Sequence, residues 1–513
     1  MKRIILTALI TCITLVGFSQ QLKFKIQGIQ DTTVHLVKYV GSKLYYADTS
    51  EIKKGVVTFD GSKQEPGIMA VLLPGQRYFE FIYNDEDVHI ETKSPNFVEH
   101  MVVKKSKENK LFLEYIKNIQ KNSQRAKVLN EQKSALDPSD KEDLTKISDE
   151  LNQINDGVTE YQKNLVLKNP DLFVSKIVKM SSDVEIPESP KDESGAIIDS
   201  NYSYKYLRDH YFDNIDFTDD RLVNTPIIQK KLEYYYSKNM LLQQPDTIIK
   251  YLTRVMDSIP ENTMMYRFFV TNMTSHFEKS KIMGMDKVTN VFIDRYYCAR
   301  NKEGNPKGYW MEKEKLEDLC KDTKTRLRLV QGEIPPNIIL PDSTNEKWHN
   351  LYELDNEYVI LYFWDPDCGH CKKETPKLQK LYSEKLKERN VEIFAVGKAT
   401  GDDFENWKKF IKKNNLSFIN VGVTKKIYEQ AKKEPRSLIP SKTTLESMNY
   451  QETYDIYSTP RVWILDKDKK IIAKSLSIAQ IEQLLDRLQD HEDSEKLFEL
   501  EKDKAEEVEE IAE

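Results

Sequence analysis

Two cysteines separated by two residues have the spacing of a redox-active dithiol. Cys368 and Cys371 enclose Gly369 and His370, and an apolar run at 359–364 precedes them. The amphipathic pattern that follows predicts a helix, so we expect both thiols on the first turn of a helix that leaves a buried strand. Unpaired backbone N–H groups and the helix dipole stabilise a thiolate at that position. Because the thiolate is the form that attacks disulfides, the sequence predicts thiol–disulfide exchange.

The two thiols are predicted to have different roles. We expect Cys368 to be the attacking thiol because it lies nearer the helix start and is more exposed. Cys371, one turn deeper, would resolve the mixed disulfide. A protonated His370 would stabilise the thiolate and make the disulfide easier to reduce, which favours an oxidising couple.

Length and charge limit the classes of protein. The 513 residues are 39% hydrophobic and 31% charged, with a net charge of −6. This length predicts two to four domains. The acidic balance and the lack of a basic stripe argue against nucleic-acid binding, and no cofactor is predicted.

The first twenty residues are typical of a secretory signal. Lys2 and Arg3 precede an apolar stretch from Ile4 to Val16, with small and polar residues after it. No later run of eighteen apolar residues follows, so we expect no stable membrane insertion once the signal is removed. The predicted location is the periplasm or cell envelope, where disulfides persist.

The hydrophobic pattern changes along the chain and predicts a multidomain protein. Alternation at period two predicts an N-terminal antiparallel β domain, and helical periodicity then predicts a central all-α domain. A β-α-β pattern predicts a C-terminal α/β domain. The last segment has twelve acidic and three basic residues from Asp490 onward, which predicts a solvated helix or disorder. The predicted divisions are 1–20 (signal), 21–104 (β-rich), 105–332 (helical), 333–490 (α/β) and 491–513 (acidic tail).

Two further cysteines, Cys298 and Cys320, lie near the ends of predicted helices. In an exported protein they could form a structural disulfide, or they could be two half-buried free thiols. Sequence alone gives no geometry to decide between these alternatives.

Three segments together resemble a known family. GEIPPNIIL, YFWDPDCGHCKKETP and YDIYSTPRVWILDKDKKII are similar to segments of the TlpA/ResA group of envelope thiol–disulfide oxidoreductases. The resemblance covers about 333–490 and implies a thioredoxin fold. The β-rich and helical regions resemble, more loosely, two uncharacterised modules that precede such domains.

The resemblance also implies roles for particular residues. Pro460 would be a cis-proline beside the dithiol, and the backbone of Thr459 would pair with an extended substrate segment. Glu374 would exchange a proton with Cys371. Thioredoxin itself has a buried aspartate on the central strand where this sequence has Tyr362. We therefore expect the proton to come from Glu374 or water, although Glu374 could instead be an ordinary solvated side chain.

Trp364, Gly369 and His370 are expected to line the surface that a substrate meets, although Trp364 could equally belong to the core. The expected partners are protein disulfides or dithiols and a membrane or envelope thiol protein that donates electrons.

Other functions fit the sequence less well. A peroxiredoxin-type peroxidase would need Thr or Ser three residues before the attacking cysteine, where Asp365 stands. A c-type haem site would need His in place of Lys372, and no second Cys/His cluster provides zinc ligands. A non-enzymatic, partner-binding protein with an incidental redox site is the remaining alternative. The direction of electron flow stays open, because the histidine favours oxidation and the family resemblance implies reduction.

Overall fold

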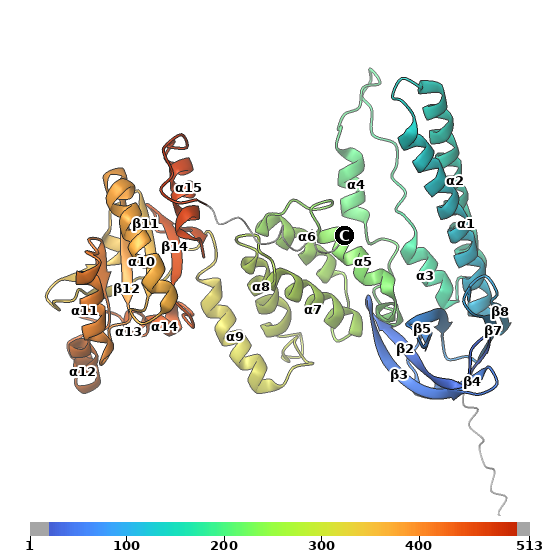
Figure 1. The fold of residues 1–513 in the computed structure, drawn as a ribbon, viewed down its shortest axis with the longest axis horizontal. Helices are drawn as coiled ribbons and strands as arrows, with labels where there is room; N and C mark the ends of the chain where they lie inside the picture. Colours follow the sequence, from blue (N-terminus) through green and yellow to red (C-terminus); the bar gives the residue numbers. More distant parts are fainter. Residues whose placement is uncertain (1–19, 500–513) are drawn as a thin grey trace, which may run out of the picture. The chain divides into compact units, whose positions relative to one another are not determined.

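The structure is a computed structural model that describes residues 20–499. The predicted signal sequence, apart from its last residue, and the tail beyond residue 499 lie outside the described residues. The chain divides into two compact units, Met1–Gln243 with Lys250–Phe269, and Gln244–Ile249 with Val270–Glu513. Figure 1 shows strands at the start of the chain, helices after them, and a mixed α/β region last. This order confirms the predicted multidomain fold class.

The N-terminal region contains two four-stranded sheets, ordered β4-β1-β7-β8 and β3-β2-β5-β6. Alternate side chains such as Leu22, Phe24 and Phe81 point into one shared apolar core, as the period-two pattern predicted. The pairs are antiparallel except for β1 and β7, which run parallel. The strands are β1 Gln21–Gln27, β2 Thr32–Val40, β3 Lys43–Ile52, β4 Val56–Asp60, β5 Gly67–Leu73, β6 Arg77–Tyr83, β7 Val88–Lys93 and β8 Val102–Lys105.

The central helices begin with a hairpin of α1 (Lys107–Ala135) and α2 (Lys141–Lys168), which pack against each other (Figure 1). Buried Glu108 fixes the start of the next helix, because its carboxylate accepts the backbone N–H groups of Phe173 and Val174. The predicted helical region 105–332 is divided between the two compact units. Its other helices are α3 Phe173–Ser181, α4 Tyr202–His210, α5 Pro226–Tyr236, α6 Pro245–Asp257, α7 Met264–Glu278, α8 Asp286–Ile293 and α9 Lys313–Leu327.

The C-terminal region is built on a five-stranded sheet of order β13-β12-β11-β14-β15. The central strand β11 (Tyr358–Trp364) runs parallel to β12 (Val391–Gly397) and antiparallel to β14 (Arg461–Asp466). This confirms the predicted β-α-β unit. Strands β14 and β15 form an antiparallel pair after it. The remaining elements are β9 Ile339–Pro341, β10 Trp348–Asn350, α10 Gly369–Leu381, α11 Asp403–Lys413, β13 Ile419–Val421, α12 Lys425–Lys433, α13 Leu445–Met448, α14 Tyr450–Thr453, β15 Ile471–Lys474 and α15 Ile478–Leu488.

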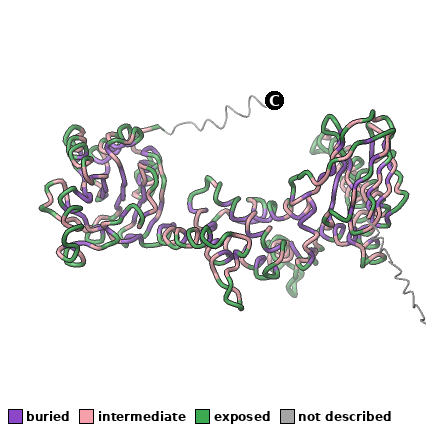
Figure 2. The backbone as a smooth tube through the Cα atoms, turned by 90° about the horizontal axis from the view of Figure 1, so that it is seen from below, coloured by how far each residue is buried: buried purple, intermediate pink, exposed green. Residues whose placement is uncertain are grey.

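Strand β11 is buried on both faces, and its side chains alternate between two apolar cores. Tyr362 and Trp364 face a core that includes residues of α10 and α15. Leu361 and Phe363 face the other core. The buried segments run through the interior of this region (Figure 2). The continuous apolar run therefore reflects a central strand covered by helices, which holds the end of β11 and the start of α10 in place.

The beginning of the acidic tail differs from its prediction. Residues 491–499 form no helix, and Leu497 and Phe498 pack against the core beside α10 and α15. The helix alternative is wrong for this segment, but most of its residues are solvated as predicted, and only Ser494, Leu497 and Phe498 are partly buried. Charge composition did not predict the packing of Leu497 and Phe498, because these two apolar side chains and two buried carboxylates of α15 determine where the segment lies.

Candidate active site

The dithiol lies where β11 ends and α10 begins. Cys368 is the N-cap of α10 and has extended backbone geometry, and its N–H donates to the carbonyl of Asp365 at 3.2 Å. The turn is closed further by the N–H of Asp367, which donates to Asp365 Oδ1 at 2.8 Å. A Cβ placed on Gly369 would meet nothing within 4 Å, so the backbone beside Cys368 faces open space. The strand-to-helix turn thus presents one thiol at the surface.

Cys368 is partly exposed and carries an activated thiol. Its S–H donates to the carbonyl oxygen of Thr459 at 3.2 Å. Burial by itself would raise the pKa of Cys368, but hydrogen bonds outweigh it. These bonds come from the backbone N–H of Cys371, the side chains of Thr459 and Cys371, and the backbone N–H of His370, and they lower the pKa. Cys368 can therefore act as the attacking thiolate.

Cys371 lies in the opposite environment. It is fully buried and packs in the core beneath the helix start. Burial raises the pKa of Cys371 to about 12, although the backbone N–H of Asp365 points at its sulfur at 3.5 Å. The same turn of helix thus holds one thiol prepared to ionise and one that stays protonated. This asymmetry matches the roles expected of an attacking and a resolving cysteine.

A buried pair of hydroxyls lies in the same core as Cys371. Tyr362 is 1% exposed, and its hydroxyl is 2.8 Å from that of Thr375. The sequence pointed to Tyr362 because it stands where thioredoxin has an aspartate. Thr375 was not predicted as part of the site. The position of Thr375, four residues after Cys371 on a predicted helix, is the signal that could have found it.

Glu374 and His370 lie on the other side of the dithiol. They line a groove of about 730 Å³ together with Lys377 and Pro460. The Glu374 side chain is 30% exposed and pairs with Lys377 at 2.9 Å. The carboxylate is thus at the wall of an open groove rather than free in solvent.

The loop before β14 completes the site. The Thr459–Pro460 peptide bond is cis, as the family resemblance implied. Trp364 is only 1% exposed and packs against Phe410 with ring centroids 5.1 Å apart. The core role, one of two alternatives left by the sequence, is the one that the structure gives Trp364. Trp364 and Thr459 are both among the residues around a second hollow, of about 180 Å³.

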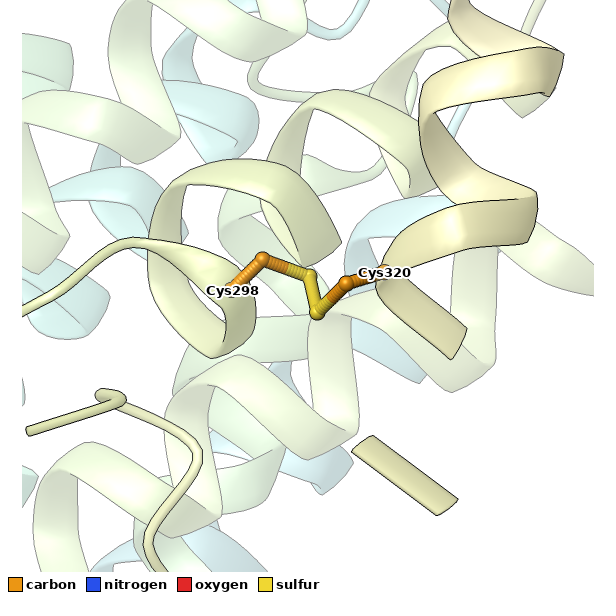
Figure 3. The surroundings of a disulfide bond; sticks show 2 residues. All are labelled: Cys298 and Cys320. Atoms are coloured by element: carbon orange, nitrogen blue, oxygen red, sulfur yellow. A yellow bond between two sulfur atoms is a disulfide. The ribbon is translucent and has the colours of Figure 1, made fainter. Parts of the chain in front are cut away.

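Cys298 and Cys320 form a disulfide with an S–S distance of 2.04 Å (Figure 3). Cys298 ends the π-helical turn Asp294–Cys298, and Cys320 lies in α9. The free-thiol alternative does not hold in the structure. This bond is distinct from the Cys368–Cys371 pair, whose thiols are both free.

The described residues contain no group of three or more His, Cys, Asp or Glu side chains placed to hold a metal ion. None of the helices within 20–499 is long and apolar enough to cross a membrane.

By fold and by site, the C-terminal region is a thioredoxin-like domain with a dithiol at its first helix. Residues 332–474 match the AhpC/TSA family. Residues 145–302 and 21–112 match two domains of unknown function, DUF5106 and DUF4369.

Relatives named "Thiol-disulfide oxidoreductase ResA" match part of the chain. A relative from Bacillus cereus is 28% identical over 183 residues, which are 36% of this chain and 83% of that protein. A relative from Halalkalibacterium halodurans is 37% identical over 87 residues, 17% of this chain and 47% of that protein. The chain is therefore similar, over about a third of its length, to the TlpA/ResA group of thiol–disulfide oxidoreductases.

Two solved structures are similar to parts of the chain. One from Cytophaga hutchinsonii, described as a domain of a possible thiol-disulfide isomerase, is 30% identical and has a TM-score of 0.25, covering 31% of this chain and 94% of that one. A thioredoxin-like protein from Bacteroides caccae is 16% identical with a TM-score of 0.38, covering 59% of this chain and 98% of that one.

Proposed function

We propose that this protein exchanges disulfides with exported proteins in the cell envelope, with Cys368 attacking and Cys371 resolving. The observation that carries the proposal is the contrast between the two thiols. One is partly exposed at a helix N-terminus with a lowered pKa, and the other is fully buried with a pKa raised to about 12. Exchange needs a nucleophile that ionises first and a second thiol that reacts only once the mixed disulfide exists.

The bonds, protons and electrons of the proposed exchange balance without a cofactor. The Cys368 thiolate attacks one sulfur of a substrate disulfide, the substrate S–S bond breaks, and the released substrate thiolate takes up a proton. Cys371 then loses its proton and attacks Cys368 Sγ, which releases the second substrate thiol. The substrate is reduced by two electrons, and Cys368 and Cys371 become a disulfide. An envelope dithiol partner returns the two electrons, or the same steps run backward and oxidise a substrate dithiol.

The second step requires that Cys371 give up its proton despite its burial. We assign the acceptor role to Glu374, which lies three residues further along α10 and therefore on the same face. Its contact with Lys377 holds the carboxylate at the wall of the groove. Replacing Glu374 with glutamine is expected to slow resolution about tenfold and leave attack by Cys368 unchanged. Rapid-mixing measurements of mixed-disulfide decay test this, with exposed Glu384→Gln as the matched control. Equal decay rates in both variants would remove Glu374 from the mechanism.

Several residues beside Cys368 are proposed to meet the substrate. The backbone of Thr459, next to Pro460, would pair with an extended segment of the substrate. Gly369 leaves space for that segment, and His370 lies at the groove beside it.

Export of the chain is proposed from the signal-like residues 1–20. The Cys298–Cys320 disulfide supports this proposal, because structural disulfides persist mainly in oxidising compartments. We also propose that 333–490 carries the activity, and that 21–104 and 105–332 are separate modules preceding it.

The proposal is tested on the full chain with insulin as the disulfide substrate and dithiothreitol as the reductant. Cys368→Ser should abolish catalysis. Cys371→Ser, incubated with insulin in the absence of dithiothreitol, should accumulate a mixed disulfide that non-reducing electrophoresis detects. A Cys298→Ala/Cys320→Ala double variant keeps the active-site pair and should remain active while folded. Turnover that survives Cys368→Ser would refute the proposal. The reduction potential, measured by equilibration with glutathione, gives the direction: about −180 mV indicates an isomerase-like oxidant and about −270 mV a thioredoxin-like reductant.

A further inference from the structure

Residues 491–499, which we call the C-terminal strap, are tied to a buried carboxylate of α15. Glu482 is 1% exposed, and its two oxygens accept the backbone N–H groups of Leu497 at 2.8 Å and Phe498 at 3.0 Å. Lys385, in the turn after α10, pairs with the same carboxylate. A buried carboxylate is stable only when it is paired and hydrogen-bonded, and here the strap supplies two of its partners.

A second buried carboxylate holds the strap one helical turn further along α15. Asp486 is 1% exposed and receives Lys496 Nζ at 2.7 Å and Ser494 Oγ at 3.2 Å. Arg389 reaches its other oxygen at 2.6 Å. Two anchors, spaced by one turn of α15, therefore fix both the path and the register of the strap.

The anchored strap ends at the active-site groove. Phe498 and Glu499 line the 730 Å³ groove that also contains His370, Glu374 and Pro460. The ring of Phe498 packs against the core beneath the groove.

The wall of the groove next to Phe498 is basic. Lys373 and Lys377 line the groove, and Lys380 Nζ lies 5.9 Å from the centroid of the Phe498 ring. An aromatic side chain followed by an acidic one thus lies in a groove with basic side chains, which also contains His370 and Pro460 of the proposed active site.

We propose that the C-terminal strap is an intramolecular competitor of the protein substrate, with Phe498 occupying part of the surface that a substrate polypeptide needs. This inference rests on the proposed function, because competition is defined only for a substrate that reacts at Cys368. A polypeptide disulfide must displace Phe498 before it can lie across the groove. A small disulfide reaches the exposed sulfur without entering the groove. The substrates that displace the strap most effectively are polypeptide segments with an aromatic residue beside an acidic one.

The test compares a large and a small disulfide on the full chain. Phe498→Ala removes the ring and leaves both carboxylate anchors intact. We expect the KM of this variant for insulin to fall roughly three- to tenfold with kcat unchanged. Without the ring, molecules whose groove is free to bind a polypeptide become the main population. The rate with 5,5′-dithiobis(2-nitrobenzoate), a small disulfide, should stay within about twofold of wild type, since Cys368 itself is unchanged.

Two truncations separate the strap from the residues after it. Deleting 491–513 should lower the insulin KM as Phe498→Ala does, and a synthetic peptide of residues 491–499 added back should raise it competitively. Deleting only 500–513 retains the strap and should leave KM unchanged. An insulin KM that is unchanged or higher in Phe498→Ala would overturn the inference, as would an equal effect of both truncations. A failure of the proposed function would be seen in a different experiment, as activity that survives Cys368→Ser.

Discussion

The contrast between the two thiols can be measured directly with single-cysteine variants. Cys371→Ser leaves Cys368 as the only thiol of the pair, and Cys368→Ser leaves Cys371. Neither variant can form the active-site disulfide, so no reductant is needed. The Cys298–Cys320 disulfide then stays intact and unreactive. The second-order rate of alkylation by iodoacetamide reports the thiolate fraction of each remaining cysteine.

The expected difference follows from the two pKa values. With a pKa of about 12, Cys371 is a thiolate in only about one molecule in 100,000 at pH 7. A cysteine with a pKa of 9.0 is about 1% thiolate at that pH, and Cys368 exceeds this because its pKa is lowered from that value. The alkylation rates at pH 7 should therefore differ by at least about 1,000-fold. Loss of Cys368 changes this little, since burial is the main cause of the high pKa of Cys371.

The pH profile separates ionisation from steric shielding. The rate for Cys368 should level off at a lower pH than the rate for an ordinary cysteine, whereas the rate for Cys371 should rise about tenfold per pH unit up to pH 10. A shielded thiol of ordinary pKa would instead reach a low plateau near pH 9. Intact-protein mass spectrometry follows each reaction, and alkylation in 6 M guanidinium gives the unfolded control. Rates within tenfold of each other at pH 7, or plateaus at the same pH, would refute the assignment of attacking and resolving thiols.

Three further predictions concern stability. Replacing both Cys298 and Cys320 with alanine opens a loop with a sequence separation of 22 and should lower the free energy of unfolding by roughly 3 kcal/mol in urea titrations; an unchanged midpoint would contradict this. Gly397→Ala should cost about 1–3 kcal/mol and lower the melting temperature, because a Cβ there would lie 2.0 Å from Trp407 Nε1; wild-type melting would show that the ring moves freely. The pKa of Asp219 is lowered to about 2 because ion pairs with arginine and lysine outweigh the effect of burial, so its stabilisation is complete above pH 4 and lost as the pH falls through 2. Asp219→Asn should therefore lower stability by about 2 kcal/mol at pH 7 and by progressively less toward pH 2, in unfolding titrations across that range; a difference that is independent of pH would exclude the carboxylate as the cause.

The sequence alone determined the features that depend on neighbours along the chain. Alternation at period two predicted the β-rich region, and the helical period predicted the central helices, because burial of one face repeats with the geometry of each element. The position of Cys368 and Cys371 at the start of α10 followed from the apolar run, the turn and the amphipathic segment. Since the helix terminus itself favours a thiolate, the chemistry could also be predicted.

Only the tertiary structure decided the features that join distant residues. The contrast between the two thiols depends on the core that buries Cys371, and Cys368 contacts the carbonyl of Thr459, 91 residues away. The Cys298–Cys320 bond stayed one of two alternatives until the fold brought the two Cα atoms to 5.6 Å.

The first part of the acidic tail shows the same limit. Its charge count predicts a solvated segment, but two carboxylates of α15 hold it against the core. Hydrogen bonds and burial across the fold depend on which elements meet in space, and local sequence patterns do not contain that information.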